Sequence, residues 1–222
     1  MKNEWSRGNS THKRTNRTPI NFSRLRCFYV LRELIIERMR EKYGRRDRRI
    51  IYAHNLDQNI IYTLMGVKSS ISNEMIMGEL IHLGVSTLLR DGIEKCDKIQ
   101  IKPEIAMILN DEIKSRFINE RDGILFVYLC GTPDALTPDG KPIELKTTRS
   151  KQTIRPEWVS RIETYTWLYR KDGILIILNV ITGEERVIPI SKINDEEMKK
   201  RIELWLRGEY PRKLQTLGQY ST

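Results

Sequence analysis

The chain has 222 residues and a formal net charge of +10; 39% of its residues are hydrophobic and 31% are charged. This length and balance suit one domain of ordinary size, with enough apolar residues for a core. The longest apolar runs, residues 124–130 and 173–181, are less than half a membrane span, so we expect no transmembrane helix. The first twenty residues are polar and basic with no apolar centre, so we also expect no signal peptide.

The positive charge is concentrated in the first quarter of the chain. Residues 1–49 contain 15 Lys or Arg and 5 Asp or Glu, which accounts for the entire net charge of +10. A basic segment beside a neutral body indicates a polyanionic partner, most often nucleic acid. The alternative for residues 1–19 is a solubilising or disordered tail without a partner.

Cysteine usage indicates a reducing compartment. Cys27, Cys96 and Cys130 are widely scattered, and no Cys-x-x-Cys sequence occurs. This pattern argues against a disulfide scaffold and against a zinc ribbon. We therefore expect Cys96 and Cys130 to be packing thiols, and we expect an intracellular, cytoplasmic protein.

The first part of the chain has two segments with helical periodicity. Apolar residues recur at helical spacing over residues 21–43 and again over 72–90, where His82 lies on the apolar stripe. Residues 1–19 show no periodicity and are expected to be disordered. Residues 50–70 are compatible with a short strand and a short helix.

The remainder of the chain alternates strand and helix patterns. We expect strands at residues 98–109 (interrupted or bent at Pro103), 123–136, 141–148, 173–181 and 185–190, and helices at 156–170 and 194–207. Residues 110–121 are polar and predict either a loop or a short helix. The sequence Thr137-Pro138-Asp139-Gly140 predicts a turn, because Pro presets one turn angle and Gly tolerates a positive φ. This order predicts an α/β or α+β fold in which helices flank a mixed sheet.

The predicted hairpin around this turn brings ionisable side chains together. Asp134 lies near the end of the outgoing strand, while Glu144 and Lys146 lie two residues apart on the returning strand and point to one face. Two carboxylates and an ammonium group at one end of a sheet suit Mg²⁺- or Mn²⁺-assisted hydrolysis of a phosphodiester bond. The alternative is a surface Glu–Lys pair on an edge strand. The ten-residue spacing from Asp134 to Glu144 across a hairpin is more specific than an isolated Glu-x-Lys sequence.

Two of these segments resemble a known nuclease signature. Gly131-Thr132-Pro133-Asp134 followed by Glu144-Leu145-Lys146 is similar to the signature of the PD-(D/E)XK nucleases. Within that superfamily the chain resembles the RecB-like branch, which includes the CRISPR-associated RecB-like exonucleases. The spacing from Gly78 to His82 resembles the Gly-x-x-x-His helix motif of this branch, and that from Arg161 to Tyr165 resembles its Gln-x-x-x-Tyr helix motif.

The resemblance implies a fold and a set of metal ligands. It implies a restriction-endonuclease-like core with the element order αβββαβ. The implied ligands of Mg²⁺ or Mn²⁺ are His82, Asp134, Glu144 and the carbonyl of Leu145. Asp134 and Glu144 are also counted as catalytic, together with Lys146, which is implied to orient the attacking water.

Further residues are expected to contact DNA or support the lysine. The resemblance implies that Arg161 and Tyr165 hold DNA or the lysine, and Tyr165 is counted with the catalytic residues. The basic connector is expected to follow the DNA backbone without reading sequence, through Arg45, Arg46, Arg48 and Arg49.

The chain departs from the family pattern in two places. The family's glutamine is replaced by Arg161, which is able to contact a phosphate instead. The C-terminal cysteine triad is absent, and Cys27 alone cannot hold a cluster that needs four ligands. We therefore expect no iron–sulfur cluster.

Together these features predict a metal-dependent deoxyribonuclease, with exonuclease action on DNA ends or single strands favoured. We divide the chain into a basic arm (1–20), an N-terminal helical extension (21–70), a nuclease core (71–210) and a tail (211–222). The alternatives are a junction-resolving or other structure-specific endonuclease, a non-catalytic nucleic-acid-binding protein with the same fold, and an adaptor whose arm binds an acidic surface. The sequence leaves the oligomeric state open.

Overall fold

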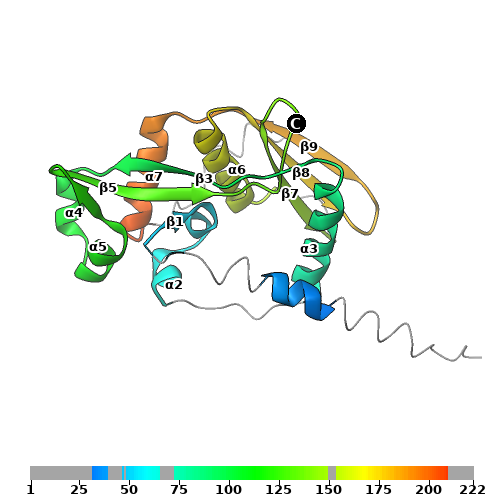
Figure 1. Ribbon diagram of the computed structural model, residues 1–222, viewed down its shortest axis with the longest axis horizontal. Helices are drawn as coiled ribbons and strands as arrows, with labels where there is room; N and C mark the ends of the chain where they lie inside the picture. Colours follow the sequence, from blue (N-terminus) through cyan, green and yellow to red (C-terminus); the bar gives the residue numbers. More distant parts are fainter. Residues whose placement is uncertain (1–31, 40–46, 48, 66–72, 150–153, 210–222) are drawn as a thin grey trace, which may run out of the picture.

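The computed structural model describes residues 32–39, 47, 49–65, 73–149 and 154–209, and Figure 1 shows how their elements are arranged. The strands are β1 (Ile51–Tyr52), β2 (Arg90–Asp91), β3 (Lys95–Gln100), β4 (Asn119–Arg121), β5 (Ile124–Gly131), β6 (Ala135–Leu136), β7 (Pro142–Thr148), β8 (Gly173–Asn179) and β9 (Glu185–Ile190). The helices are the 3-10 helix η1 (Ala53–Asp57), α2 (Ile60–Met65), α3 (Asn73–Ser86), α4 (Pro103–Ile108), α5 (Asp111–Phe117), α6 (Pro156–Tyr169) and α7 (Asp195–Leu206). Residues 32–39 form a further helix.

The strands form two mixed sheets. In the first sheet β5 pairs with β1 in parallel and with β3 and β4 in antiparallel orientation. The second sheet has the order β2-β6-β7-β8-β9, in which only β7 and β8 are parallel. Helix α6 connects these two strands, since a parallel pair needs a long crossover. The principal elements therefore run α3, β3, β5, β7, α6, β8, and the predicted α+β fold with helices beside mixed sheets is confirmed.

The prediction of one sheet and one continuous strand over residues 123–136 is wrong. Strand β5 ends at Gly131, and the chain resumes as β6 in the second sheet. Pro133 lies in the break and has no N–H group with which to continue the hydrogen bonds of a strand ladder. Residues 132–134 therefore pass from one sheet to the other and position Asp134 between them.

The predicted strand over residues 98–109 is also wrong in its second half. Strand β3 ends at Gln100, and α4 begins at Pro103 with Lys102 in an extended conformation before it. Proline is favoured at the first position of a helix because its φ suits the helix and its missing N–H would have no partner there. Asn110 then starts α5, accepting a hydrogen bond from the backbone N–H of Ile113 at 2.8 Å.

The predicted turn at residues 137–140 is confirmed. The N–H of Gly140 donates to the carbonyl of Thr137 at 2.8 Å, and Gly140 has a φ of 79°. This conformation is accessible to glycine at little cost. The turn joins β6 to β7 and pairs Ala135 with Ile143.

Helix α6 lies at the centre of the molecule and contacts strands of both sheets (Figure 1). It begins at Pro156 and ends at Tyr169, and the next residue, Arg170, caps it with a left-handed φ of 57°. Its buried side chains join both sheets into one apolar core, as expected of a helix that is covered on most sides. Even this helix has only 14 residues, and no helix in the described ranges is long and apolar enough to cross a bilayer.

Residues 51–58 belong with the core rather than with a purely helical extension. Strand β1 pairs with β5, and η1 packs against α6. The indole N–H of Trp205 donates to the carbonyls of Asn55 and Gln58 at 3.0 and 2.9 Å. The short strand and short helix expected in residues 50–70 are present as β1 and α2, whereas the pairing of β1 with β5 was not predicted, because nothing in a two-residue strand indicates its partner.

Much of the predicted basic region lies outside the described residues. The arm (1–20), Arg45, Arg46 and Arg48 are outside the described part of the chain, and so is the tail (211–222). Of the helix predicted over residues 21–43, the part described as helical is 32–39, which packs against α3 through a small apolar cluster.

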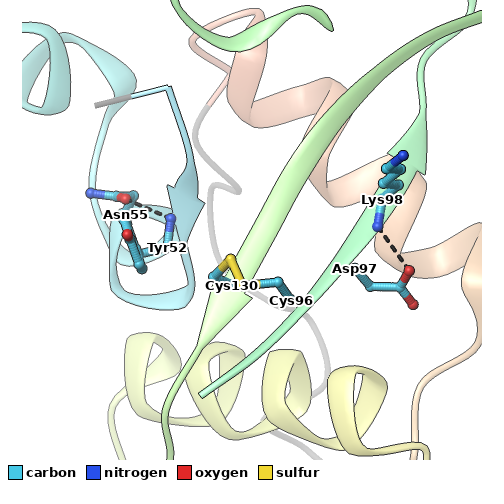
Figure 2. Close-up of a disulfide and its surroundings, with 6 residues drawn as sticks. All are labelled: Tyr52, Asn55, Cys96, Asp97, Lys98 and Cys130. Atoms are coloured by element: carbon cyan, nitrogen blue, oxygen red, sulfur yellow. Dashed lines mark hydrogen bonds between the residues drawn. A yellow bond between two sulfur atoms is a disulfide. The ribbon is translucent and has the colours of Figure 1, made fainter. Parts of the chain in front are cut away.

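Cys96 and Cys130 form a disulfide, which contradicts the expectation of two packing thiols (Figure 2). The two residues lie directly opposite each other on β3 and β5. This register brings together cysteines that are 34 residues apart in sequence, a separation that gave no indication of pairing. The cysteine argument for a reducing compartment therefore loses two of its three residues.

The backbone contact between Gly92 and Pro133 predicts a stability difference between two glycines. A Cβ on Gly92 would lie 1.9 Å from the carbonyl oxygen of Pro133, whereas one on Gly84 in α3 meets no atom within 4 Å. We expect Gly92→Ala to lower the free energy of unfolding by about 1–3 kcal/mol through overpacking. Gly84→Ala should raise it by about 0.5–1 kcal/mol, as in other helix interiors. Urea denaturation of both variants tests this, and shifts of the same sign would contradict it.

The disulfide predicts that a reductant lowers stability. Reduction should decrease the free energy of unfolding by about 2–4 kcal/mol, because the cross-link restricts the unfolded chain. Thermal melts with and without a phosphine reductant measure the effect. The control variant Cys27→Ser keeps the disulfide and should show the same loss of stability on reduction. Labelling of three thiols in unreduced, denatured protein would show that the bond does not form.

Candidate active site

Asp134 lies beside β7, as the hairpin predicts. Its Oδ2 accepts a hydrogen bond from the backbone N–H of Leu145 at 2.8 Å. The antiparallel pairing of β6 with β7 places residue 134, just before β6, next to residue 144. The structure thus brings Asp134 together with Glu144 and Lys146 across a break between two sheets.

The backbone of Leu145 faces the same side as Asp134. Within an extended strand the N–H and C=O of one residue point to the same edge, and the N–H of Leu145 points to Asp134 rather than into a ladder. The pairing of β6 with β7 ends at Ile143, so β6 does not cover the Leu145 carbonyl. This edge of β7 therefore presents the carbonyl that the family resemblance implies as a metal ligand.

Glu144 is almost fully buried and is held by two cations. Its side chain is 2% exposed, and its Oε1 contacts Nζ of Lys146 and, at 3.4 Å, Nη1 of Arg161. Burial and the charge of Asp134 raise the pKa of Glu144, although Lys146 and Arg161 act in the opposite direction. Both contacts fall on one carboxylate oxygen, so neither cation engages Oε2.

Asp57 belongs to the same cluster of charged side chains as Glu144 and its two cations, and no sequence motif indicated it. It lies at the end of η1, and its Oδ2 accepts hydrogen bonds from Nε (2.7 Å) and Nη2 of Arg161. Burial raises the pKa of Asp57 to about 6, even though Arg161 lowers it. One signal could have indicated such a residue: an arginine that replaces a neutral glutamine in a buried motif needs a carboxylate partner.

His82 approaches the cluster from α3. Its Nδ1 lies 3.3 Å from Oδ1 of Asp134, and Gly78, one turn earlier, faces Thr147 of β7. Burial alone would lower the pKa of His82, but the hydrogen bond and charge of Asp134 outweigh burial and raise it. In turn, His82 lowers the pKa of Asp134 to about 2 against the effect of burial. The two side chains therefore form an ion pair when His82 is protonated.

Tyr165 lies in the core one turn after Arg161. It is 5% exposed, and a Cβ on Gly131 would lie 2.7 Å from its ring, so the glycine allows β5 and α6 to approach closely. Burial and the charge of Glu144 raise the pKa of Tyr165 well above its ordinary value, so the hydroxyl is neutral at physiological pH. Its contact with DNA or with Lys146 stays a prediction.

The remaining predicted contacts are less informative. Arg49 is exposed and binds Asp47 through its side chain. Arg161, which was expected to contact DNA, directs its guanidinium to Asp57 and Glu144.

The donor atoms suit a hard divalent cation, but they are held by other partners in this arrangement. Two carboxylates, an imidazole and a carbonyl are the ligand types expected for Mg²⁺ or Mn²⁺. Over the described ranges, however, no three His, Cys, Asp or Glu side chains form a group that could hold a metal ion. In this arrangement His82 pairs with Asp134, and Lys146 and Arg161 contact Oε1 of Glu144. A metal ion bound here has to replace some of these internal pairs.

Comparison with known proteins supports the fold but gives no information on the function. No protein-family model matches the chain, and no curated sequence matches it. A solved structure described as "Crystal structure of SSO0001" is similar, with a TM-score of 0.60 and 16% sequence identity over 82% of this chain and 86% of that chain. Such a likeness shows a shared α+β fold, whereas function depends on the side chains at a site.

The pairing of His82 with Asp134 predicts a measurable change in one histidine. In Asp134→Asn the charge that raises the pKa of His82 is removed, so burial dominates and the pKa should fall below that of the wild type. The chain has three histidines, so NMR titration of the imidazole protons can resolve each one, with His82→Gln for assignment. The pKa of His54 serves as the internal control. An unchanged pKa of His82 would show that the pair does not form in solution.

Proposed function

We propose that the protein is a metal-dependent deoxyribonuclease of the RecB-like PD-(D/E)XK type. The observation that carries the proposal is the hydrogen bond from the N–H of Leu145 to Asp134, which fixes one carboxylate beside the Glu144-Leu145-Lys146 strand. A buried carboxylate, a second carboxylate and a lysine then lie at one break between two sheets. A surface Glu–Lys pair, the alternative reading, does not account for a glutamate that is 2% exposed.

The proposed metal ligands are His82, Asp134, Glu144 and the carbonyl of Leu145. A bound Mg²⁺ or Mn²⁺ would neutralise charge on the scissile phosphate and favour a water-derived nucleophile. Glu144 and Asp134 supply the negative charge that attracts such an ion. Protonated His82 has to release its proton before its nitrogen is able to act as a ligand, so metal binding should be weaker at low pH.

Lys146 is proposed to act on the water and the phosphate. Its Nζ contacts Glu144, and its side chain is 15% exposed, so it is held in place while still reaching solvent. From this position the ammonium group would orient the attacking water and stabilise the negative charge that develops on the phosphate oxygens. Arg161 adds a second positive charge beside the same oxygen of Glu144.

DNA is the proposed partner, with the basic residues 1–49 as a contact to the phosphate backbone. Action on ends or single strands is favoured, and a cytoplasmic location belongs to the same proposal. Incubation with end-labelled single-stranded, double-stranded and circular DNA, in Mg²⁺, Mn²⁺ or EDTA, separates these possibilities. Cleavage of circular DNA would favour an endonuclease, and binding without cleavage would favour a non-catalytic protein.

Three substitutions test the proposed roles. Asp134→Asn, Glu144→Gln and Lys146→Ala should each reduce the rate of DNA cleavage by at least ~10²–10³-fold, as when one stabilising group is removed from an enzyme site. DNA binding should persist or tighten in the two carboxylate variants, because each loses a negative charge beside a phosphate. The exposed Glu184, on the turn before β9, provides the control variant Glu184→Gln. Wild-type cleavage by Glu144→Gln and Lys146→Ala would place the activity elsewhere.

A further inference from the structure

Arg161 is shared unequally between two carboxylates from distant parts of the chain. Its Nε and Nη2 both bind Oδ2 of Asp57, with a distance of 2.7 Å for Nε, while its Nη1 lies 3.4 Å from Oε1 of Glu144. Asp57 lies 104 residues before Arg161, on η1, and its side chain is only 9% exposed. The stronger contact is therefore with Asp57 and the weaker one with Glu144.

The geometry of a guanidinium group makes this division important. The group is planar, rigid and always protonated, and it binds carboxylates best through two parallel hydrogen bonds. Asp57 binds the edge formed by Nε and Nη2 and so fixes the orientation of the group, and of the other edge only Nη1 reaches Glu144. Without Asp57, the half-buried Arg161 would be free to turn and to pair with Glu144 through two nitrogens.

From this arrangement we propose that Asp57 is a positioning residue that holds Arg161 away from full pairing with Glu144 and so keeps Glu144 available to a divalent cation. This inference rests on the proposed metal-dependent function. It assigns to η1 a role that no motif in the chain indicated. It also explains how the chain tolerates an arginine in the place of the family's glutamine.

The charge balance of the cluster supports the same conclusion. When His82 is neutral, three carboxylates (Asp57, Asp134, Glu144) face two permanent cations (Lys146, Arg161), which leaves one negative charge to attract a metal ion. Asp57→Asn removes that excess, whereas the double change Asp57→Asn with Arg161→Gln restores it. The double variant also replaces the ion pair with two neutral amides, so no unpaired charge remains buried.

Mn²⁺ titration followed by the EPR signal of free Mn²⁺ tests the proposal without using enzymatic activity. Asp57→Asn should weaken Mn²⁺ binding by about 10–100-fold, the range expected when a residue that supports a ligand is removed. Arg161→Gln alone should bind at least as tightly as the wild type. The double variant should recover to within about threefold of the wild type, which a merely structural role of Asp57 would not produce.

A matched control is available in another Asp–Arg pair. Asp97 binds Arg170 at 2.8 Å outside the cluster, so Asp97→Asn should leave Mn²⁺ binding unchanged. Circular dichroism melts establish which variants are folded, and if Asp57→Asn does not fold, the double variant and Asp57→Glu, which retains the charge, provide the comparison with wild type. Folded Asp57→Asn with wild-type affinity, or a folded double variant that binds Mn²⁺ at least tenfold more weakly than wild type, would overturn the proposal.

A failure of the proposed function would give different Mn²⁺-binding results from a failure of the role of Asp57. Wild-type protein should bind Mn²⁺ and lose this binding in Asp134→Asn and Glu144→Gln. If wild-type protein does not bind Mn²⁺, or if both carboxylate variants retain binding, the metal site and the role of Asp57 fall together. If only the Asp57 variants behave unexpectedly, the metal site stands and the positioning role falls.

Discussion

The burial of the Glu144 carboxylate constrains the whole site. A charge that is withdrawn from water has to be compensated by partners, and removing one partner of a buried pair costs about 3–5 kcal/mol. Here Lys146 comes from the same strand and Arg161 from the central helix α6, and Arg161 in turn requires Asp57 from η1. These successive ion pairs connect β7, α6 and the N-terminal part of the core. The His82–Asp134 pair closes the cluster from α3.

The same compensation gives the site its proposed chemistry. Groups that are fixed before a substrate arrives stabilise developing charge without a further cost of reorganisation. Lys146 and Arg161 are fixed in this way by carboxylates, and Asp134 is fixed by a backbone N–H. The fold that holds them is shared with a structure at 16% identity, so the overall architecture does not identify the reaction. The proposed reaction therefore depends on these side chains, and substituting them tests it.

Local sequence rules were sufficient for the central part of the site. Strand alternation and the turn at residues 137–140 predicted that Asp134, Glu144 and Lys146 meet, and the structure places them together. Three features depended on contacts between distant segments and were not predicted: the pairing of β1 with β5 that positions η1 and Asp57, the Cys96–Cys130 disulfide, and the division into two sheets at Pro133. Helix α4 was missed for a local reason, since Pro103 was interpreted as an interruption or bend in a strand rather than the start of a helix.

The most direct test of the central claim is a crystal structure with Mn²⁺, in which anomalous scattering locates the ion. We expect one strong peak whose protein ligands include carboxylate oxygens of Asp134 and Glu144, with Lys146 remaining close by. We also expect Arg161 to stay on Asp57 when the ion is bound. A peak elsewhere, or a cluster that retains all of its internal ion pairs at millimolar Mn²⁺ with no peak at Glu144, would contradict the assignment of this site as a metal-dependent nuclease centre.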